Sequence, residues 1–265
     1  MDERKVVDIQ EFNIQTMPLS CTWIIVGPPA SGKSSLIEML SYYNKHKYPV
    51  ARVFVGTVEG YKKACKIFGD LYVSPKYDEA EERAHIHRQR TVVGMQHCTC
   101  SNKKTCVHSV GTYAINIIDD ASDDPKVFKT KTMKALFKLG SQHYNQLLMV
   151  GLQYAIDLPI DLRPSVSYVA IFRQPGVEQR KRLYTNFGGP TGTYENFCDL
   201  MDQLTGNYTC MIIKQRSLSN RLEDNIFYLQ TKLIGSWRFG CQEYREWNRR
   251  RYNPHYQEST AIDDV

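Results

Sequence analysis

The chain has 265 residues, of which 42% are apolar and 11% aromatic. This composition is sufficient for one large α/β domain or two small ones, and it argues against a disordered chain. The formal charge of +6 comes from 34 basic and 28 acidic residues, a mild excess that is compatible with a polyanionic partner without specifying one.

No run of about eighteen apolar residues is present, so we expect no membrane span. The N-terminal sequence lacks the apolar segment of a signal peptide. A protein that stays in reducing surroundings keeps its cysteines as thiols or metal ligands. We therefore expect a soluble intracellular protein in which the eight cysteines form no disulfides.

The first half of the chain alternates between predicted strands and helices. Residues 1–18 are polar and read as an N-terminal extension. Thr22–Val26 is a continuous apolar run ending in glycine, which is typical of a parallel strand covered on both faces. A second strand is predicted at 51–55, and helices are predicted at 34–43, 61–68 and 78–90.

The second half continues this alternation. It predicts helices at 126–139, 178–187 and 194–204, and strands at 113–120, 146–153, 167–172, 208–213 and 226–230. Strands that alternate with helices imply an α/β fold with a wound, mostly parallel sheet. We place this domain at 19–235, followed by a tail at 236–265.

A phosphate-binding loop is predicted between the first strand and the first helix. The segment Gly-Pro-Pro-Ala-Ser-Gly-Lys-Ser at 27–34 has P-loop spacing, although a glycine turn can match this loose pattern by chance. Lys33 would contact the β- and γ-phosphates, and the Ser34 hydroxyl would bind Mg²⁺. The helix that follows presents its N-terminus to the anion. We assign nucleotide binding to Gly27, Pro28, Pro29, Ala30, Ser31, Gly32, Lys33, Ser34 and Ser35.

Three polar residues at strand ends complete the predicted catalytic site. Asp119 would hold Mg²⁺ through water, and Asp120 would polarise the attacking water as a general base. Two aspartates after an apolar run can also simply cap the next helix, but the P-loop upstream favours the catalytic role. Gln153 points at the γ-phosphate if its strand lies between the P-loop strand and the Asp119 strand. Taken alone, such a glutamine is usually just solvated.

These motifs together resemble a known family. The P-loop, Ile117-Ile-Asp-Asp120, Leu152-Gln-Tyr-Ala-Ile-Asp-Leu-Pro159 and Leu162-Arg163 look like those of the genome-packaging ATPases of poxviruses and other nucleocytoplasmic large DNA viruses. That family belongs to the FtsK–HerA superfamily. The likeness continues in order to about residue 232, through Phe172-Arg-Gln and Tyr208-Thr-Cys-Met-Ile-Ile213.

The resemblance implies a P-loop NTPase fold, a three-layer sandwich of the additional-strand (ASCE) type that uses ATP and Mg²⁺. It also implies a homo-oligomeric ring that threads double-stranded DNA into a preformed capsid, with capsid or portal-region proteins as partners. Such a protein works in the host-cell cytoplasm at viral assembly sites, or in the virion.

By the same resemblance, Lys33, Ser34, Asp119, Asp120 and Gln153 take the roles given above. An arginine from a neighbouring subunit would complete each site and stabilise charge on the γ-phosphate. Arg163 is the first candidate and Arg173 the second, with a surface ion pair as the alternative for either. Many relatives carry glutamate where this chain has Asp120, whose side chain has a shorter reach.

Three features are left open by the resemblance. A Cys/His-rich insertion at 85–110 contains four candidate ligands of a structural Zn²⁺, namely Cys98, Cys100, Cys106 and His108. The alternative is a loop with free thiols. The lysines between Lys126 and Lys138 would contact DNA in a channel or simply form a solvated face. The basic and aromatic tail would bind DNA, the core or a capsid protein.

Two other functions share the P-loop. A small-molecule kinase would use arginines within 173–182 as a lid, and a non-catalytic adaptor would serve in capsid assembly. A guanine-binding switch is disfavoured because no Asn-Lys-x-Asp motif is present. Paired aspartates followed by a polar strand end favour a hydrolysing motor.

Overall fold

The computed structural model of the chain describes residues 9–95, 111–120, 125–154 and 158–254. The predicted zinc ligands Cys98, Cys100, Cys106 and His108 lie outside the described residues, so the zinc site stays a prediction. Within the described part, no three histidine, cysteine or acidic side chains come together as a metal site. None of the described helices is long and apolar enough to cross a membrane.

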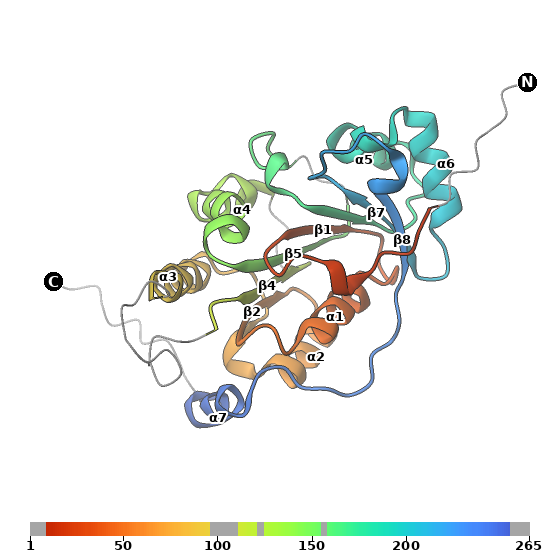
Figure 1. Ribbon diagram of the computed structural model, residues 1–265. Helices are drawn as coiled ribbons and strands as arrows, with labels where there is room; N and C mark the ends of the chain where they lie inside the picture. Colours follow the sequence, from red (N-terminus) through yellow and green to blue (C-terminus); the bar gives the residue numbers. More distant parts are fainter. Residues whose placement is uncertain (1–8, 96–110, 121–124, 155–157, 255–265) are drawn as a thin grey trace, which may run out of the picture.

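An eight-stranded sheet forms the centre of the molecule, in the order β3-β2-β4-β5-β1-β6-β7-β8 (Figure 1). The six strands from β3 to β6 in this order are parallel, while β7 and β8 each pair antiparallel. The strands are β1 (Thr22–Val26), β2 (Val50–Val55), β3 (Val73–Ser74), β4 (Ala114–Asp119), β5 (Gln146–Leu152), β6 (Tyr168–Ile171), β7 (Thr209–Lys214) and β8 (Ile226–Gln230). The mostly parallel sheet confirms the predicted fold class.

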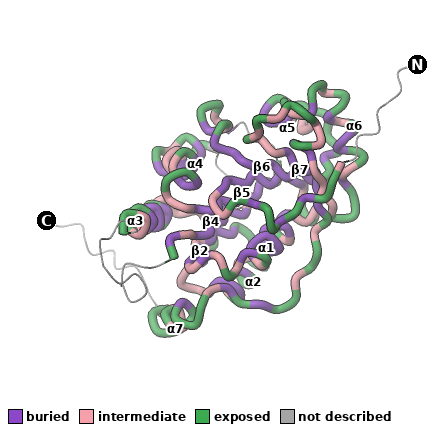
Figure 2. The backbone as a smooth tube through the Cα atoms, viewed as in Figure 1, coloured by how far each residue is buried: buried purple, intermediate pink, exposed green. Residues whose placement is uncertain are grey.

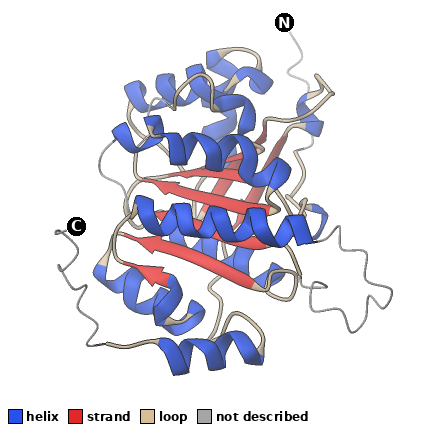
Figure 3. Ribbon diagram, turned by 90° about the vertical axis from the view of Figure 1, so that its left-hand side faces the viewer, coloured by secondary structure: helices blue, strands red, loops and turns tan. Residues whose placement is uncertain are grey.

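Helices cover both faces of this sheet, which gives three layers (Figure 3). One apolar cluster joins α1 and α2 to one face, and a second joins α3, α4, α5 and α6 to the other. The helices are α1 (Lys33–Asn44), α2 (Val58–Phe68), α3 (Glu79–Met95), α4 (Lys131–His143), α5 (Val177–Phe187), α6 (Tyr194–Leu204) and α7 (Gln242–Arg251).

The central strands are buried on both faces. Every residue of β1, β4 and β5 is buried, and Figure 2 shows this interior along the middle of the sheet. A strand covered on both sides has no solvent-facing positions, so its sequence is a continuous apolar run. This explains why these three strands were predicted close to their observed bounds.

The helix predicted at 126–139 is wrong in its first part. Pro125–Lys129 forms a 3-10 turn, and α4 begins only after Thr130. The Thr130 hydroxyl accepts a hydrogen bond from the Met133 amide at 3.2 Å. Such a cap satisfies a backbone donor at the start of a helix and therefore fixes where the helix begins.

The segment after β8 crosses the α1–α2 layer before it forms α7 (Figure 1). Trp237 and Phe239 are buried in the core cluster that contains α1 and α2. The Trp237 indole nitrogen donates to Glu38 Oε1 at 3.1 Å. In α7, the Tyr244 hydroxyl donates to Phe68 O at 2.8 Å, and Asn248 Oδ1 accepts from the Leu71 amide at 2.8 Å. These contacts hold α7 beside the end of α2.

Candidate functional site

The P-loop connects the end of β1 to the start of α1. Ala30 and Gly32 have φ angles of 60° and 112°, so the loop turns through left-handed backbone that favours glycine at position 32. A Cβ atom on Gly27 would lie 2.8 Å from Phe172 Cβ and 2.4 Å from Ser31 Oγ. Glycine is therefore needed at position 27, where the loop passes close to the strand next to it.

Lys33 is buried, and its ammonium group lies inside the loop. Its Nζ donates to Gly27 O at 2.8 Å and to Pro28 O at 3.2 Å. The same Nζ is 3.8 Å from Asp120 Oδ2. A cation held between the loop carbonyls and an acidic strand end is placed to contact a phosphate chain bound in the loop.

Ser34 and Asp119 form the second part of the site. The Ser34 hydroxyl donates to Asp119 Oδ2 at 2.6 Å. Asp119 is 5% exposed, and its Oδ1 has no hydrogen-bond partner among the described residues. Burial raises the pKa of Asp119 to about 6 and the nearby Asp120 also raises it, against the lowering effects of the Ser34 hydrogen bond and of Lys33.

These residues fit a magnesium ion. A buried carboxylate oxygen without a partner is energetically costly unless a ligand or water satisfies it. Hydroxyl and carboxylate oxygens are the hard donors that Mg²⁺ prefers, and this ion keeps several of its waters when bound. Ser34 would thus hold the ion directly, and Asp119 would hold it through water.

The sheet order satisfies the condition set for Gln153. β5 lies between β4 and β1, so Gln153, directly after β5, falls between the aspartates and the P-loop. Its Nε2 donates to Asp120 Oδ2 at 3.2 Å. Asp120 has a φ angle of 48°, an unusual backbone conformation of the kind that occurs at functional sites. Lys33 and Gln153 thus converge on one carboxylate oxygen.

Gly151 is a site residue that the sequence reasoning missed. It pairs directly with Asp119 across β4 and β5. A Cβ atom at this position would lie 2.2 Å from Asp119 Oδ1. The absence of a side chain at position 151 therefore leaves room for the unpartnered oxygen, and only the strand register could have revealed this.

The two candidate arginines lie at opposite ends of the parallel strands, before and after β6. Arg163 precedes Ser167, whose amide donates to Thr22 O at the start of β1, and its own Nε donates to Leu158 O at 3.0 Å. Arg163 is therefore at the amino-terminal end of the parallel strands, away from the P-loop, which follows the carboxyl end of β1. Arg173 follows the carboxyl end of β6, on the same side of the sheet as the P-loop, but its Nη2 donates to Asp202 O at 2.5 Å.

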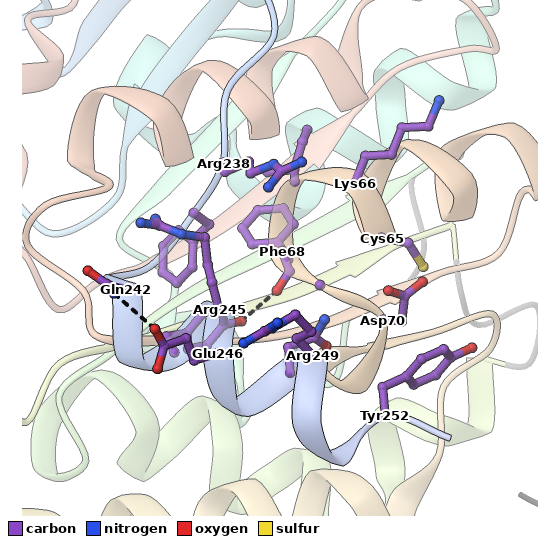
Figure 4. A pocket seen from close by; sticks show the side chains of 15 residues that line it. Cys65, Lys66, Phe68, Asp70, Arg238, Gln242, Arg245, Glu246, Arg249 and Tyr252 are labelled. Carbon is purple, nitrogen blue, oxygen red and sulfur yellow. Dashed lines mark hydrogen bonds between the residues drawn. The ribbon is translucent and has the colours of Figure 1, made fainter. Parts of the chain in front are cut away.

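Basic side chains are distributed unevenly outside the phosphate site. Lys138 forms an ion pair with Asp161 at 2.8 Å, and Lys134 lies 3.9 Å from the same carboxylate. A hollow of about 590 Å³ between α2 and α7 is lined by more cations than anions (Figure 4). Its charged side chains are Lys66, Asp70, Arg238, Arg245, Glu246 and Arg249.

Comparison with known proteins places the chain among viral proteins. No family model matches it. It is 30% identical over 260 residues to the uncharacterized protein 075L of Invertebrate iridescent virus 6, covering 97% of this chain and 95% of that protein. It is also 32% identical over 235 residues to protein 088R of Invertebrate iridescent virus 3, covering 87% and 85%. The chain belongs to the family of these iridescent virus proteins.

The fold is also found in solved structures. The genome packaging NTPase B204 of Sulfolobus turreted icosahedral virus 2, in complex with AMP, superimposes with a TM-score of 0.55. It covers 82% of this chain and 100% of B204 at 15% identity. The chain therefore has the fold of a P-loop ATPase, in agreement with the sheet order and the loop geometry.

Proposed function

We propose that this family member is an ATPase that drives double-stranded viral DNA into the capsid during virion assembly, as a homo-oligomeric ring. The observation that carries the proposal is the arrangement at one sheet edge, where Ser34 contacts Asp119 while Lys33 and Gln153 both approach Asp120. The same fold in a viral genome packaging NTPase supports it.

Each residue has a distinct task in ATP hydrolysis. Lys33 neutralises charge on the β- and γ-phosphates. Ser34 and Asp119 would hold Mg²⁺, which would supply positive charge at the phosphate oxygens. Asp120 accepts the proton of the attacking water as general base. Gln153 orients the Asp120 carboxylate through its hydrogen bond and is placed to respond when the γ-phosphate leaves.

The small-molecule kinase is the less well supported alternative. Its lid would need arginines from 173–182 that are free to close over the phosphates. Arg180 instead makes a bidentate pair with Asp202, at 2.8 and 2.6 Å, and Arg173 also contacts this residue. Bidentate pairs between arginine and a carboxylate are among the stronger ionic contacts. Arg173 and Arg180 are therefore both held against Asp202 of α6.

We assign the DNA-contacting surface by asking which basic side chains form no ion pair with the described residues and are therefore available to bind phosphate. Lys134 and Lys138 on α4 share Asp161, so binding a DNA phosphate there would compete with an existing ion pair. Arg238 and Arg249 form no ion pair within the described part of the chain, and they line the hollow beside α7 (Figure 4). We therefore favour α7 over α4 for contact with the DNA backbone.

The salt dependence of DNA binding tests this assignment. Removing a phosphate contact reduces the slope of log affinity against log salt by about one per contact. We expect an Arg238→Ala, Arg249→Ala double variant to reduce this slope by about two. The matched Lys134→Ala, Lys138→Ala variant should leave it near the wild-type value. The opposite result would move the DNA surface to α4.

ATP turnover with and without duplex DNA tests the motor as a whole. We expect DNA to stimulate the wild type, and Asp120→Asn to lower kcat by about 10² or more, the range of a lost general base. Arg163→Ala and Lys33→Ala should each be inactive alone. A mixture should regain activity, since one variant supplies the P-loop and the other supplies the arginine. Unchanged turnover by Arg163→Ala, together with no effect of DNA, would contradict the ring mechanism.

A further inference from the structure

A strained turn lies next to the P-loop and has no role in the core. Gly206-Asn207-Tyr208-Thr209 connects α6 to β7, and the Thr209 amide donates to Gly206 O at 2.8 Å. Asn207 and Tyr208 have φ angles of 48° and 61°. These angles define a type I′ turn, in which glycine is the favoured residue at the position held by Tyr208. A bulky residue in left-handed backbone is uncommon, and such strain clusters at ligand sites.

The Tyr208 ring is exposed, although its backbone is fixed. The residue as a whole is 62% exposed. The Thr231 amide and hydroxyl both donate to Tyr208 O, at 3.0 and 2.7 Å. These two hydrogen bonds tie the turn to the residue after β8. The chain therefore holds a large aromatic side chain toward solvent from a rigid support.

Tyr208 lies against Gly32, the P-loop residue that precedes α1. A Cβ atom placed on Gly32 would be 3.4 Å from Tyr208 Cδ1 and 3.1 Å from Thr231 Oγ1. β7 runs antiparallel to β6, so its first residue is at the carboxyl edge of the parallel strands, where the P-loop also lies. The ring thus borders the loop on the β7–β8 side.

Three polar residues at the ends of β4 and β5 indicate how a triphosphate would lie in the loop. Asp119 ends β4, and Asp120 and Gln153 directly follow β4 and β5, so all three lie on one side of β1. In the proposed ATPase, this is the side that the γ-phosphate would face. Tyr208 and Thr231 adjoin β7 and β8, on the other side of β1. A triphosphate with its β-phosphate in the loop and its γ-phosphate toward the aspartates would therefore extend its nucleoside toward this second side.

We propose that Tyr208 is the stacking platform for the nucleobase of bound ATP, and that Thr231 positions it through the turn. This inference rests on the proposed ATPase function and adds the residue that binds the base. An aromatic face stacks on any base, so the platform contributes affinity for the nucleoside and little discrimination between adenine and guanine.

Steady-state kinetics on the full chain test the platform, with wild type, Tyr208→Phe and Tyr208→Ala. Tyr208→Ala should raise the KM for ATP about tenfold, and that for GTP similarly, because loss of base stacking on an aromatic ring typically weakens affinity by roughly fivefold to 150-fold. kcat should be retained, and Tyr208→Phe should behave as wild type. Inorganic tripolyphosphate, which has no base, should inhibit all three proteins equally.

Tyr43→Ala is the matched control. It removes another exposed tyrosine, about 15 Å along α1 from Lys33 at 1.5 Å per residue, and should leave KM unchanged. An unchanged KM in Tyr208→Ala would overturn the inference, as would equal weakening of ATP and tripolyphosphate, which would indicate a distorted P-loop. Failure of the wild type to hydrolyse ATP would instead remove the proposed function itself.

Discussion

Replacing Asp119 by asparagine should stabilise the protein at neutral pH while abolishing ATP hydrolysis. Burial raises the pKa of Asp119 to about 6, compared with 3.8 for a free aspartate. The charged form is therefore disfavoured by folding. This penalty is absent below about pH 3.8, grows as the pH rises and is complete above about pH 6. Asparagine carries no charge and escapes it.

The size of the effect follows from the difference in pKa. At about pH 7.5 the ionised Asp119 lowers the free energy of unfolding by roughly 3 kcal/mol, since one pKa unit corresponds to about 1.4 kcal/mol. At about pH 4.5 the same group lowers it by only about 1 kcal/mol. An asparagine amide without a buried partner costs about 1–3 kcal/mol, but this cost does not change with pH.

Urea unfolding of wild type and Asp119→Asn at both pH values, without nucleotide or Mg²⁺, isolates the electrostatic contribution. The free energy of unfolding of the variant minus that of the wild type should be about 2 kcal/mol larger at about pH 7.5 than at about pH 4.5. Titrating groups that do not interact with Asp119 contribute equally to both proteins and cancel. A difference independent of pH would refute the reasoning that Asp119 is held as a destabilised charge. Adding Mg²⁺ and ATP should stabilise the wild type more than the variant.

Three further substitutions test neighbouring parts of the structure. Gly151→Ala places a methyl group 2.2 Å from Asp119 Oδ1, so we expect a loss of about 1–3 kcal/mol in urea unfolding and weaker activation of ATPase by Mg²⁺; wild-type values of both would contradict the close packing. Trp237→Ala should cost about 3 kcal/mol, because the indole is buried and donates to Glu38, and limited proteolysis should then cut near α7 first. Thr130→Ala should lower stability by about 1 kcal/mol through loss of the α4 cap, measured by thermal unfolding, whereas an exposed change such as Thr91→Ala should have a smaller effect.

The features that could be predicted from sequence are those set by local chemistry. β1, β4 and β5 are fully buried, so their apolar runs identify them directly. The P-loop is contiguous, and its glycines and lysine follow from phosphate geometry. The relation of Gln153 to the aspartates needed only one further fact, the position of β5 in the sheet.

The features that sequence could not supply depend on register and on contacts between distant segments. Gly151 meets Asp119 because of the pairing between two strands. Tyr208 was predicted to begin a strand at 208–213, but it lies in the turn before β7, where its φ is positive. α3 buries Glu82, His85 and Gln89 on the side that faces the sheet, so its pattern read only as a charged helix. The docking of α7 through Tyr244 and Asn248 has no periodic signature.

The positions of the two arginines bear on the ring assembly that we propose. Arg163 lies at the end of the strands opposite to its own P-loop, and its Nε donates to Leu158 O. Arg173 lies at the correct edge but is held by Asp202. Within the described residues, one copy of the chain therefore presents Lys33 as the cation next to its own acidic strand ends, and no arginine contacts that site. An arginine that stabilises the transition state is worth about 10³–10⁵ in rate in related phosphoryl transfers. If Arg163 serves this purpose, it can do so only in the site of a second copy, and ring formation and catalysis then depend on the same residue.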